Sequence, residues 1–478
     1  MKIDYKNYED YYCPNGKFKD NWQECIKILP FISFAHIKFD KNCGLLGLVG
    51  EYIRRQYSTR INPIDNFKTQ IAESLKNYLK EKNMPNEQIE KFIKITENLL
   101  IYNENIKPID SFFLRYLPLV PKDDYINQKE KEDYERGINK IVDYLLSLGN
   151  TKEISSPSTH NDSNLFIKIL KESLENNAKK SITNKSELTY YILPYIKETF
   201  KSDLKWFLNL DDAIIVKYIP LLLYFYTCYS IVQIIIYLLN RINKDISSDK
   251  PVSLYFLLST EKASLNSEAI LNGFMSKISK ENLSYLFAKV QALDIVNCLL
   301  KNDKTMLYPQ IIEKLSETSF EENKNVCIQV LKNYYENKKS ILAKRQNAQE
   351  LEFDDDFFSL ENYEDFINKL EKICVSSISK EYTTKLPNKI YDLLNIRFLQ
   401  QRRENKVLVL DNEMLIFLIA LFTRSEKTKL TDVYRRFNDY GICFSRNTKL
   451  AIESLLLKLN LLDIKSDAGE AQYVRVIL

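Results

Sequence analysis

Glycine is scarce in this chain. Its 478 residues include only 9 glycines and 13 prolines, whereas 45% of them are hydrophobic. Nucleotide-binding α/β folds need glycine where the backbone turns tightly or approaches a phosphate closely, because a Cβ atom would be in the way. The phosphate-binding sequence Gly-x-x-x-x-Gly-Lys-Ser/Thr is also absent. These two absences argue against a nucleotide-binding fold. Long runs of Leu, Ile, Lys, Glu and Asn with helical spacing predict an all-α chain instead.

Histidine is almost absent as well. The two that occur, His36 and His160, lie far apart and lack metal-ligand spacing to each other or to a cysteine pair. A nucleophile that uses a histidine base would have only these two to choose from. The 8 cysteines are scattered without a Cys-x-x-Cys pair, and no apolar signal segment follows Met1. The pattern predicts a cytoplasmic protein without disulfides, metal or cofactor.

The chain is long enough for two or three domains. We expect an N-terminal helical region over residues 1–150 and a central helical body over 165–405, separated by a polar, turn-rich stretch. A distinct C-terminal module is expected over 411–478. Within the first region, a helical hairpin over 65–102 is predicted, because Asn83-Met84-Pro85 interrupts the apolar pattern.

Three glycines spaced by three residues, Gly44, Gly47 and Gly50, stand out near the N-terminus. Such a row either lets two segments pack closely or cradles an anion. Neither a lysine followed by serine or threonine nor a clear strand accompanies it. We therefore expect a tight loop or a close helix contact.

Residues 218–239 form the most apolar segment, which is long enough to span a bilayer. It contains Gln233 and several tyrosines, whose hydroxyl groups need hydrogen-bond partners that a protein core supplies and lipid does not. The prediction is a central core helix, and a membrane-associated helical protein is the alternative. Further helices are expected from Ser253 to Leu258 onward and over 388–403, with no fixed repeat that would indicate a solenoid.

The C-terminal module, residues 411–478, begins with two predicted helices. Asp411 can accept hydrogen bonds from the free amides of a helix over 414–422, which is apolar nearly all round and must therefore be buried. Thr431 is expected to cap a second helix over 430–437.

A third helix and two strands complete this module. Gly441 is available for the left-handed residue that closes the second helix, and Ser445 can cap the third, over 446–460. Two short strands follow over 461–464 and 473–478. Three helices followed by a hairpin predict a C-terminal winged helix-turn-helix carrying a short β-hairpin.

A winged helix can present its third helix to the major groove of double-stranded DNA. The net charge of +4 is too small for a generally basic protein, so any DNA contact must come from a local patch. Acidic residues are interspersed, and winged helices also dock proteins, so both interpretations stay open. The candidate DNA-binding residues are Arg435, Arg436, Arg446, Asn447, Lys449, Lys465 and Arg475.

The densest carboxylate cluster, Asp354-Asp355-Asp356, lies in an acidic stretch over 349–364 that also contains phenylalanines. Paired carboxylates can hold the metal ion of a nuclease, so a metal-dependent nuclease subunit is an alternative. The main expectation is a solvated loop, because a composition this rich in charge produces such clusters by chance.

Two stretches resemble a known family. The ending, Leu455–Leu462 followed by Lys465–Arg475, is similar to the C-terminus of the DptG family of DNA phosphorothioation-dependent restriction proteins. The middle is similar too, at Tyr224–Tyr226 with Ser230 and Gln233, and then at Leu254–Ser264.

The resemblance implies a role in bacterial anti-phage defence, beside the restriction proteins DptF and DptH. ATPase and helicase-like functions belong to those partners, and the family offers no catalytic residues to transfer. We therefore expect a non-enzymatic, cytoplasmic subunit of a phosphorothioation-dependent DNA restriction complex. A helical body would act as its scaffold, and the winged helix would contact DNA or a partner subunit.

Overall fold

The fold is mostly helical, with a few short strands. This computed structural model describes residues 3–19, 27–29, 44–56, 59–60, 67–102, 105–119, 128–149, 165–175, 179–180, 191–239, 249–262, 268–273, 278, 283–301, 305–344, 351–402, 405–424, 426–465 and 471–478. The prediction of a mostly helical chain is confirmed. The predicted linker, residues 149–164, lies outside the described residues except for Gly149. Both histidines also lie outside them.

The elements of the N-terminal part are α1 (Tyr5–Tyr12), η1 (Pro14–Gly16), α3 (Gly44–Gln56), β1 (Thr59–Arg60), α4 (Phe67–Glu81), α5 (Asn86–Leu100), β2 (Ile101–Tyr102), β3 (Asn105–Ile106), η3 (Ser111–Tyr116), α6 (Gln128–Leu148), α7 (Leu165–Glu175) and β4 (Lys179–Lys180). Those of the central part are α8 (Pro194–Phe207), α9 (Asp212–Leu239), β5 (Leu254–Leu258), α10 (Glu268–Leu271), α13 (Leu286–Leu300), α14 (Tyr308–Ser316), α15 (Phe320–Ala343), η6 (Asp355–Phe358), α16 (Tyr363–Ser377), α17 (Lys380–Asn395), β6 (Leu399–Arg402) and β7 (Asn405–Leu410). The C-terminal part contains α18 (Asn412–Thr423), β8 (Thr428–Lys429), α19 (Leu430–Asp439), β9 (Ile442–Phe444), α20 (Arg446–Lys458), β10 (Leu462–Lys465) and β11 (Ala471–Val474).

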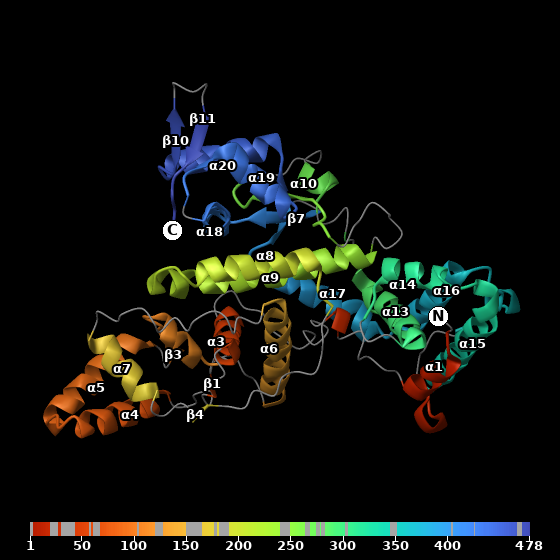
Figure 1. Cartoon of the computed structure of the whole chain (residues 1–478), viewed down its shortest axis with the longest axis horizontal. Coiled ribbons are helices and arrows are strands. Elements are labelled where there is room, and N and C mark those ends of the chain that lie inside the picture. Colours follow the sequence, from red (N-terminus) through yellow and green to blue (C-terminus); the bar gives the residue numbers. More distant parts are fainter. Residues whose placement is uncertain are drawn as a thin grey trace.

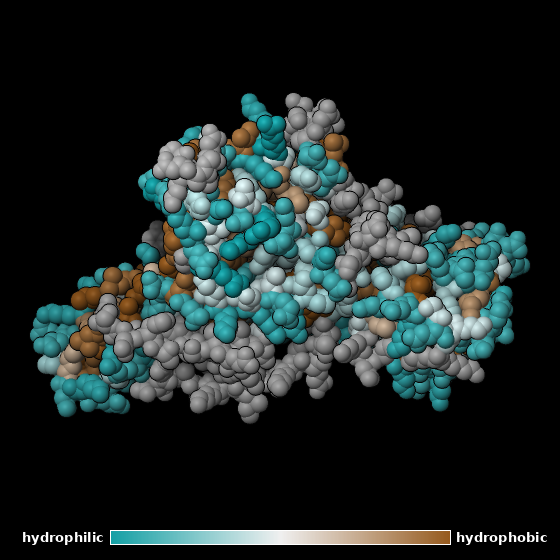
Figure 2. All heavy atoms as spheres, turned by 45° about the horizontal axis from the view of Figure 1, so that its top comes forward, coloured by the Kyte–Doolittle hydropathy of each residue, from teal (hydrophilic) through white to brown (hydrophobic). Residues whose placement is uncertain are grey.

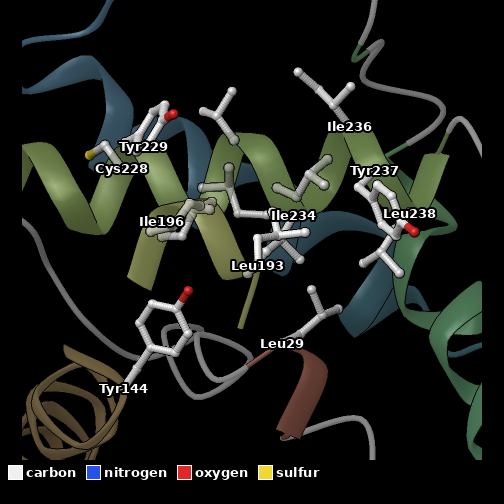
Figure 3. Close-up of a cluster of buried hydrophobic side chains, with 14 of the residues drawn as sticks. Leu29, Tyr144, Leu193, Ile196, Cys228, Tyr229, Ile234, Ile236, Tyr237 and Leu238 are labelled. Atoms are coloured by element: carbon white, nitrogen blue, oxygen red, sulfur yellow. The ribbon is translucent and has the colours of Figure 1, made fainter. Parts of the chain in front are cut away.

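Helix α9 crosses the middle of the molecule (Figure 1), with the C-terminal elements on one side and α3 and α6 on the other. Among the described helices it alone is long and apolar enough to cross a membrane, and 94% of its most apolar stretch is buried inside the protein. In Figure 3, side chains of α9 face Leu193 and Ile196 at the start of α8, and Tyr144 approaches from α6. The core-helix prediction for residues 218–239 is therefore confirmed.

Two buried tyrosines of α9, Tyr224 and Tyr226, find hydrogen-bond partners within the protein. The Tyr224 hydroxyl donates to the carbonyl oxygen of Leu393 at 2.8 Å and accepts from the amide of Arg397 at 3.1 Å. The Tyr226 hydroxyl donates to Oδ2 of Asp203 at 2.6 Å. An unpaired buried hydroxyl costs about 1–3 kcal/mol, which these partners avoid.

The spaced glycines of α3 allow a close approach between segments. A Cβ atom on Gly47 would lie 2.1 Å from the carbonyl oxygen of Leu119, and one on Gly50 would lie 2.7 Å from that of Leu117. The close-contact interpretation is therefore confirmed for these two glycines. Nearby, Arg54 donates to the carbonyl oxygens of Arg115 and Leu117 at 2.9 and 2.7 Å, which ties α3 to η3.

The predicted helical hairpin over 65–102 is present as α4 and α5. Together with α7 these helices enclose a hydrophobic cluster of their own, which includes Ile71, Leu75 and Phe113. This lobe lies at the left end of the molecule in Figure 1. Almost all the other buried apolar side chains belong to one large cluster that extends from Ile3 to Val474.

A four-stranded sheet with the order β6-β7-β5-β9 was not predicted. Residues 254–258 form the strand β5, so the helix predicted from Ser253 onward is wrong. The helix predicted over 388–403 is also displaced, because α17 ends at Asn395 and residues 399–402 form β6. A short apolar run is compatible with a buried helix or a buried strand, and only its partners decide between them.

Strand β5 connects the central part to the C-terminal part. Its first residues pair in parallel with β9, Leu254 opposite Ile442 and Phe256 opposite Phe444. Its last residues pair in parallel with β7, Leu257 opposite Val409. The two halves of β5 therefore pair with β7 and β9, which are both far from β5 in the sequence.

Candidate interaction surface on the C-terminal unit

Residues 411–478, which we call the C-terminal unit, contain three helices and a small sheet with the order β10-β11-β8. Asp411 caps α18, because its Oδ1 accepts from the amide of Met414 at 2.8 Å. Ser445 caps α20 by accepting from the amide of Thr448 at 3.1 Å. Gly441 has φ of 69°, the left-handed conformation expected of it. These three local predictions are confirmed.

Other local predictions for this unit need correction. Lys429, rather than Thr431, is the N-cap residue of α19, and its side chain makes no capping hydrogen bond. Helix α20 ends at Lys458, two residues before its predicted end. Strand β10 is shifted by one residue from the predicted 461–464 to 462–465, and β11 is shorter than the predicted 473–478, at 471–474. Residues 466–470, which connect the two strands, lie outside the described residues.

The unit is anchored to the central part at Asp203 of α8. Both Tyr226 of α9 and Tyr440 of the C-terminal unit donate to its Oδ2, at 2.6 and 2.7 Å, and Arg424 lies 3.2 Å from Oδ1. Burial raises the pKa of Asp203, and the two tyrosines and Arg424 oppose the effect. This polar cluster gave no sequence signal, because its members come from three separate segments.

The predicted DNA-binding residues do not form one free basic surface. Arg435 pairs with Asp432 at 3.2 Å, and Arg436 donates to the carbonyl oxygen of Phe422 at the end of α18. The Lys449 ammonium lies 5.2 Å from the centre of the Tyr434 ring. These cations are therefore engaged with the unit itself.

The last two candidate residues, Lys465 and Arg475, lie at the hairpin of β10 and β11, and only the side chain of Arg475 is described. Arg475 Nε lies 2.6 Å from Oδ1 of Asp463, and Lys427 pairs with the other oxygen. Hydrogen bonds from Lys427 and Arg475 lower the pKa of Asp463. Lys465 is the last residue of β10, opposite Ala471. Its side chain lies outside the described part of the structure.

Arg446 and Asn447 are placed as predicted, exposed in the first turn of α20. Arg446 makes no ion pair with the other residues that the structure describes. Of the seven predicted residues, these two are the ones that the structure leaves facing solvent at the start of the third helix.

Exposed apolar side chains are concentrated in this unit instead. Leu450 is 57% exposed and Leu457 is 45% exposed, one turn either side of Glu453 on the outer face of α20. Glu453 accepts a hydrogen bond from Gln472 of β11. Ile464 lies directly opposite Gln472 in the hairpin and is 56% exposed. We call Leu450, Leu457 and Ile464 the apolar patch.

The sequence contained a signal for this patch. Ile452 and Leu456 are buried and form the inner face of α20, whereas Leu459 is exposed. Leu450 and Leu457 are seven residues apart and share a helix face that does not contain Ile452. Large apolar residues on a second face of a short helix indicate either a second buried face or a binding surface.

A second exposed apolar area lies on the N-terminal lobe. Figure 2 shows brown spheres at the left end of the molecule, over the lobe that contains α4, α5 and α7. Its exposed apolar side chains include Ile95 and Leu99 on α5 and Leu165 on α7.

The acidic cluster lies on the surface. Asp354, Asp355 and Asp356 are exposed at η6, whereas Phe353 and Phe358 pack against the Tyr335 ring, with centroids 5.8 and 5.3 Å away. Among the described residues, no group of three or more His, Cys, Asp or Glu side chains could hold a metal ion. The cluster therefore consists of carboxylates that face solvent from a turn held by its aromatic side chains.

The chain matches no protein-family model, and no curated protein matches it either.

Proposed function

We propose that this protein is a non-catalytic scaffold subunit of a bacterial phosphorothioation-dependent DNA restriction complex. In this proposal its C-terminal unit is a winged helix-turn-helix that docks on a partner subunit in the cytoplasm. The observation that carries the docking role is the apolar patch on the outer face of α20.

The order of the elements supports the winged-helix assignment. Helices α18, α19 and α20 are followed by the hairpin of β10 and β11, and β8 adds a third strand to it. In a winged helix the outer face of the third helix and the adjacent hairpin form the binding surface. Leu450, Leu457 and Ile464 lie on these two elements.

The chemistry of this surface favours protein over DNA. Leucine side chains in a major groove would lose contact with water without hydrogen-bonding the base edges, and phosphates require cations. Most of the described cations that were predicted to contact DNA are paired within the unit. Glu453 in the middle of the patch would repel phosphates.

The charges around the patch favour a partner with acidic residues over a second copy of this chain. Arg446 is the first residue of α20 and Lys458 is its last. An antiparallel pair of α20 helices would bring Arg446 close to Lys458 of the other copy, which is repulsive. A partner helix with leucines in its centre and acidic residues near both ends would be complementary.

The resemblance of residues 455–475 to the DptG ending is the basis for naming the complex. It makes the restriction proteins DptF and DptH the proposed partners. The absence of a P-loop sequence agrees with a subunit that leaves ATP hydrolysis to those partners.

Binding measurements with purified DptF and DptH test the proposal. The variant with Leu450→Glu and Leu457→Glu is expected to lose at least tenfold in affinity, about 1.4 kcal/mol, since two central apolar contacts would be replaced by carboxylates. The matched control is Ile95→Glu with Leu99→Glu, which places the same charges on the exposed face of α5 and should bind normally. Equal binding by the wild type and the patch variant would refute the docking role.

DNA contact is the second candidate function of the same unit, and the exposure of Arg446 and Asn447 favours it. A gel-shift series over ionic strength with Arg446→Glu and Lys449→Glu distinguishes the two functions. If DNA is bound here, affinity should fall and its dependence on salt should weaken in these variants. Unchanged affinity for DNA would exclude DNA contact through these residues, and protein docking would remain as the proposed function of the unit.

A further inference from the structure

The exposed apolar area of the N-terminal lobe has a regular arrangement on α5. Gln88, Phe92, Ile95 and Leu99 follow one another at intervals of four, three and four residues, which places them in one stripe along the helix. Ile95 is 53% exposed and Leu99 is 51% exposed. Figure 2 shows the apolar area at this end of the molecule. We call these four residues the α5 stripe.

The core of the lobe is built from a different stripe of the same helix. This inner stripe is offset from the α5 stripe by one residue and is buried, and its members are Ile89, Ile93, Thr96 and Leu100. Its apolar members belong to the hydrophobic cluster that α5 shares with α4 and α7, whereas Ile95 and Leu99 do not. Large apolar side chains that stay in water at helical spacing indicate a surface that binds another helix.

The start of α7 widens this surface. The rings of Phe92 and Phe166 lie 5.3 Å apart between centroids, so the first turn of α7 lies beside α5. Leu165, the first residue of α7, is 70% exposed, the largest exposed fraction among the large apolar side chains that the structure describes. Two neighbouring helices therefore contribute exposed apolar groups to one end of the molecule.

The charge nearest to the α5 stripe is already balanced. Lys91 flanks the stripe, and its Nζ lies 2.6 Å from Oε1 of Glu87. Lys94 is about 100° further round the helix from Ile95. The stripe itself contains no ionisable side chain. A partner that is selected by charge needs an excess of one sign on the surface it meets. This surface has no such excess, so it fits a partner whose contacting face is apolar and uncharged as well.

The same helix of a second copy of this chain has this character. In an antiparallel pair of α5 helices with Phe92 opposite Ile95 of the other copy, Gln88 falls opposite Leu99. Each contact then occurs twice, because the pair has two-fold symmetry. The two-fold axis also brings the first turns of both α7 helices to the same side of the pair, where Leu165 adds apolar area.

The charges permit this pairing. Lys91 of one copy would lie beside Asn98 of the other, so no like charges meet along the stripe. On α20, in contrast, an antiparallel pair would bring Arg446 close to Lys458 of the other copy. The α5 stripe is therefore the better of the two surfaces for self-association.

We propose that two copies of this chain associate through their α5 stripes, which form an antiparallel helix pair with the first turns of α7 at its side. Residues at alternating four- and three-residue spacing pack as knobs into the holes of the facing helix. A polar residue in such a seam favours one register, and Gln88 supplies it here. The contact is separate from the apolar patch on α20, and it does not depend on the proposed docking function.

Sedimentation velocity with the full-length protein over a series of concentrations tests the proposal. The wild type is expected to form dimers. The variant Ile95→Glu with Leu99→Glu is expected to weaken dimerisation by about tenfold or more, because the symmetry places four carboxylates in one apolar contact. Both side chains are more than half exposed, so the circular dichroism spectrum should not change. The matched control, Leu450→Glu with Leu457→Glu, adds the same charges to α20 and should remain dimeric.

Cysteine cross-linking tests the direction of the helices. The variant Gln88→Cys with Leu99→Cys should form a disulfide-linked dimer under mild oxidation, because these two positions face each other in the antiparallel pair. The wild type, with its own cysteines, and Lys94→Cys, which is off the stripe, are the controls and should not cross-link.

Three results would overturn the proposal. The first is a wild type that stays monomeric at every concentration. The second is a dimer that persists in the α5 variant, or that the α5 and α20 variants weaken equally. The third is efficient cross-linking by Gln88→Cys alone, because the two helices would then run parallel.

Discussion

At the residue scale, Asp411 both caps a helix and pairs with an arginine from another element, whereas the hydrogen bonds of Ser445 lie within the first turn of its own helix. Asp411 uses one carboxylate oxygen to cap α18 and the other to accept from Arg397 Nη1 at 2.7 Å. Ser445 caps α20, and its Oγ also lies within hydrogen-bond distance of Thr448 Oγ1, at 2.9 Å in the same first turn. Replacement of an N-cap residue by alanine costs about 1 kcal/mol. Ser445→Ala should therefore lower the free energy of unfolding by about that much, and Asp411→Ala by more, in urea denaturation followed by circular dichroism. Equal losses would show that the Arg397 contact contributes nothing.

Asp203 leads to a prediction about pH. Its folded-state pKa is raised by burial above its ordinary value of 3.8. The folded protein therefore binds this proton more tightly than the unfolded chain does. The resulting stabilisation is complete below pH 3.8 and is lost as pH rises through the folded pKa. Asp203→Asn cannot titrate, yet it keeps an oxygen that can accept from Tyr226 and Tyr440.

Denaturation over a pH series compares the wild type with Asp203→Asn. The free energy of unfolding of the wild type should fall relative to that of the variant as pH increases from 3.8. Each tenfold difference in proton affinity is worth about 1.4 kcal/mol. The control is Asp439→Asn, an exposed carboxyl on α19. Parallel curves for the wild type and Asp203→Asn would contradict the prediction.

At the scale of elements, the packing of α3 against the segment after η3 requires glycine. A Cβ atom on Gly47 would meet a backbone carbonyl, which cannot rotate away as a side chain could. Overpacking of this kind costs about 1–3 kcal/mol. We expect Gly47→Ala to lower the melting temperature clearly, and Leu46→Ala, at an exposed position on the same helix, to leave it nearly unchanged. A larger loss of melting temperature for Leu46→Ala than for Gly47→Ala would mean that α3 can shift to accommodate the added methyl group.

Some of the elements could be predicted from the sequence and others could not. Helices α18 and α20 were recognised because Asp411 and Ser445 cap them locally and their apolar residues have helical spacing. Strand β5 was missed because its pairing partners, β7 and β9, come from distant segments. A run such as Leu254–Leu258 contains no information about those partners.

The candidate sites follow the same rule: features that depend on one segment could be predicted, and contacts between distant segments could not. The N-terminal residues of α20 could be placed from the sequence, since the start of a helix defines its first turn. The ion pairs that engage Arg435 and Arg475, and the exposure of Leu450, depend on how the hairpin packs.

At the scale of the whole molecule, the C-terminal unit shares its core with the rest of the chain. Strand β9 pairs with β5, and Phe417 of α18 stacks against Tyr218 of α9 with ring centres 5.6 Å apart. One hydrophobic cluster includes residues from both parts. Separation would expose the nearly all-apolar surface of α18 to water, at about 25 cal/mol for each Å² of apolar area.

Residues 411–478 expressed alone are therefore expected to aggregate or to form a loosely packed state. An amide ¹H–¹⁵N spectrum should show poorly dispersed peaks, and a mixture with residues 1–410 should recover solubility, because α9 and β5 would cover α18 and β9 again. The full-length chain is the reference and should unfold in one transition that includes this unit. A well-dispersed spectrum of the isolated fragment would mean that β5 and α9 are dispensable for its folding. The unit would then be an independent domain that moves on the helical body rather than a part of it.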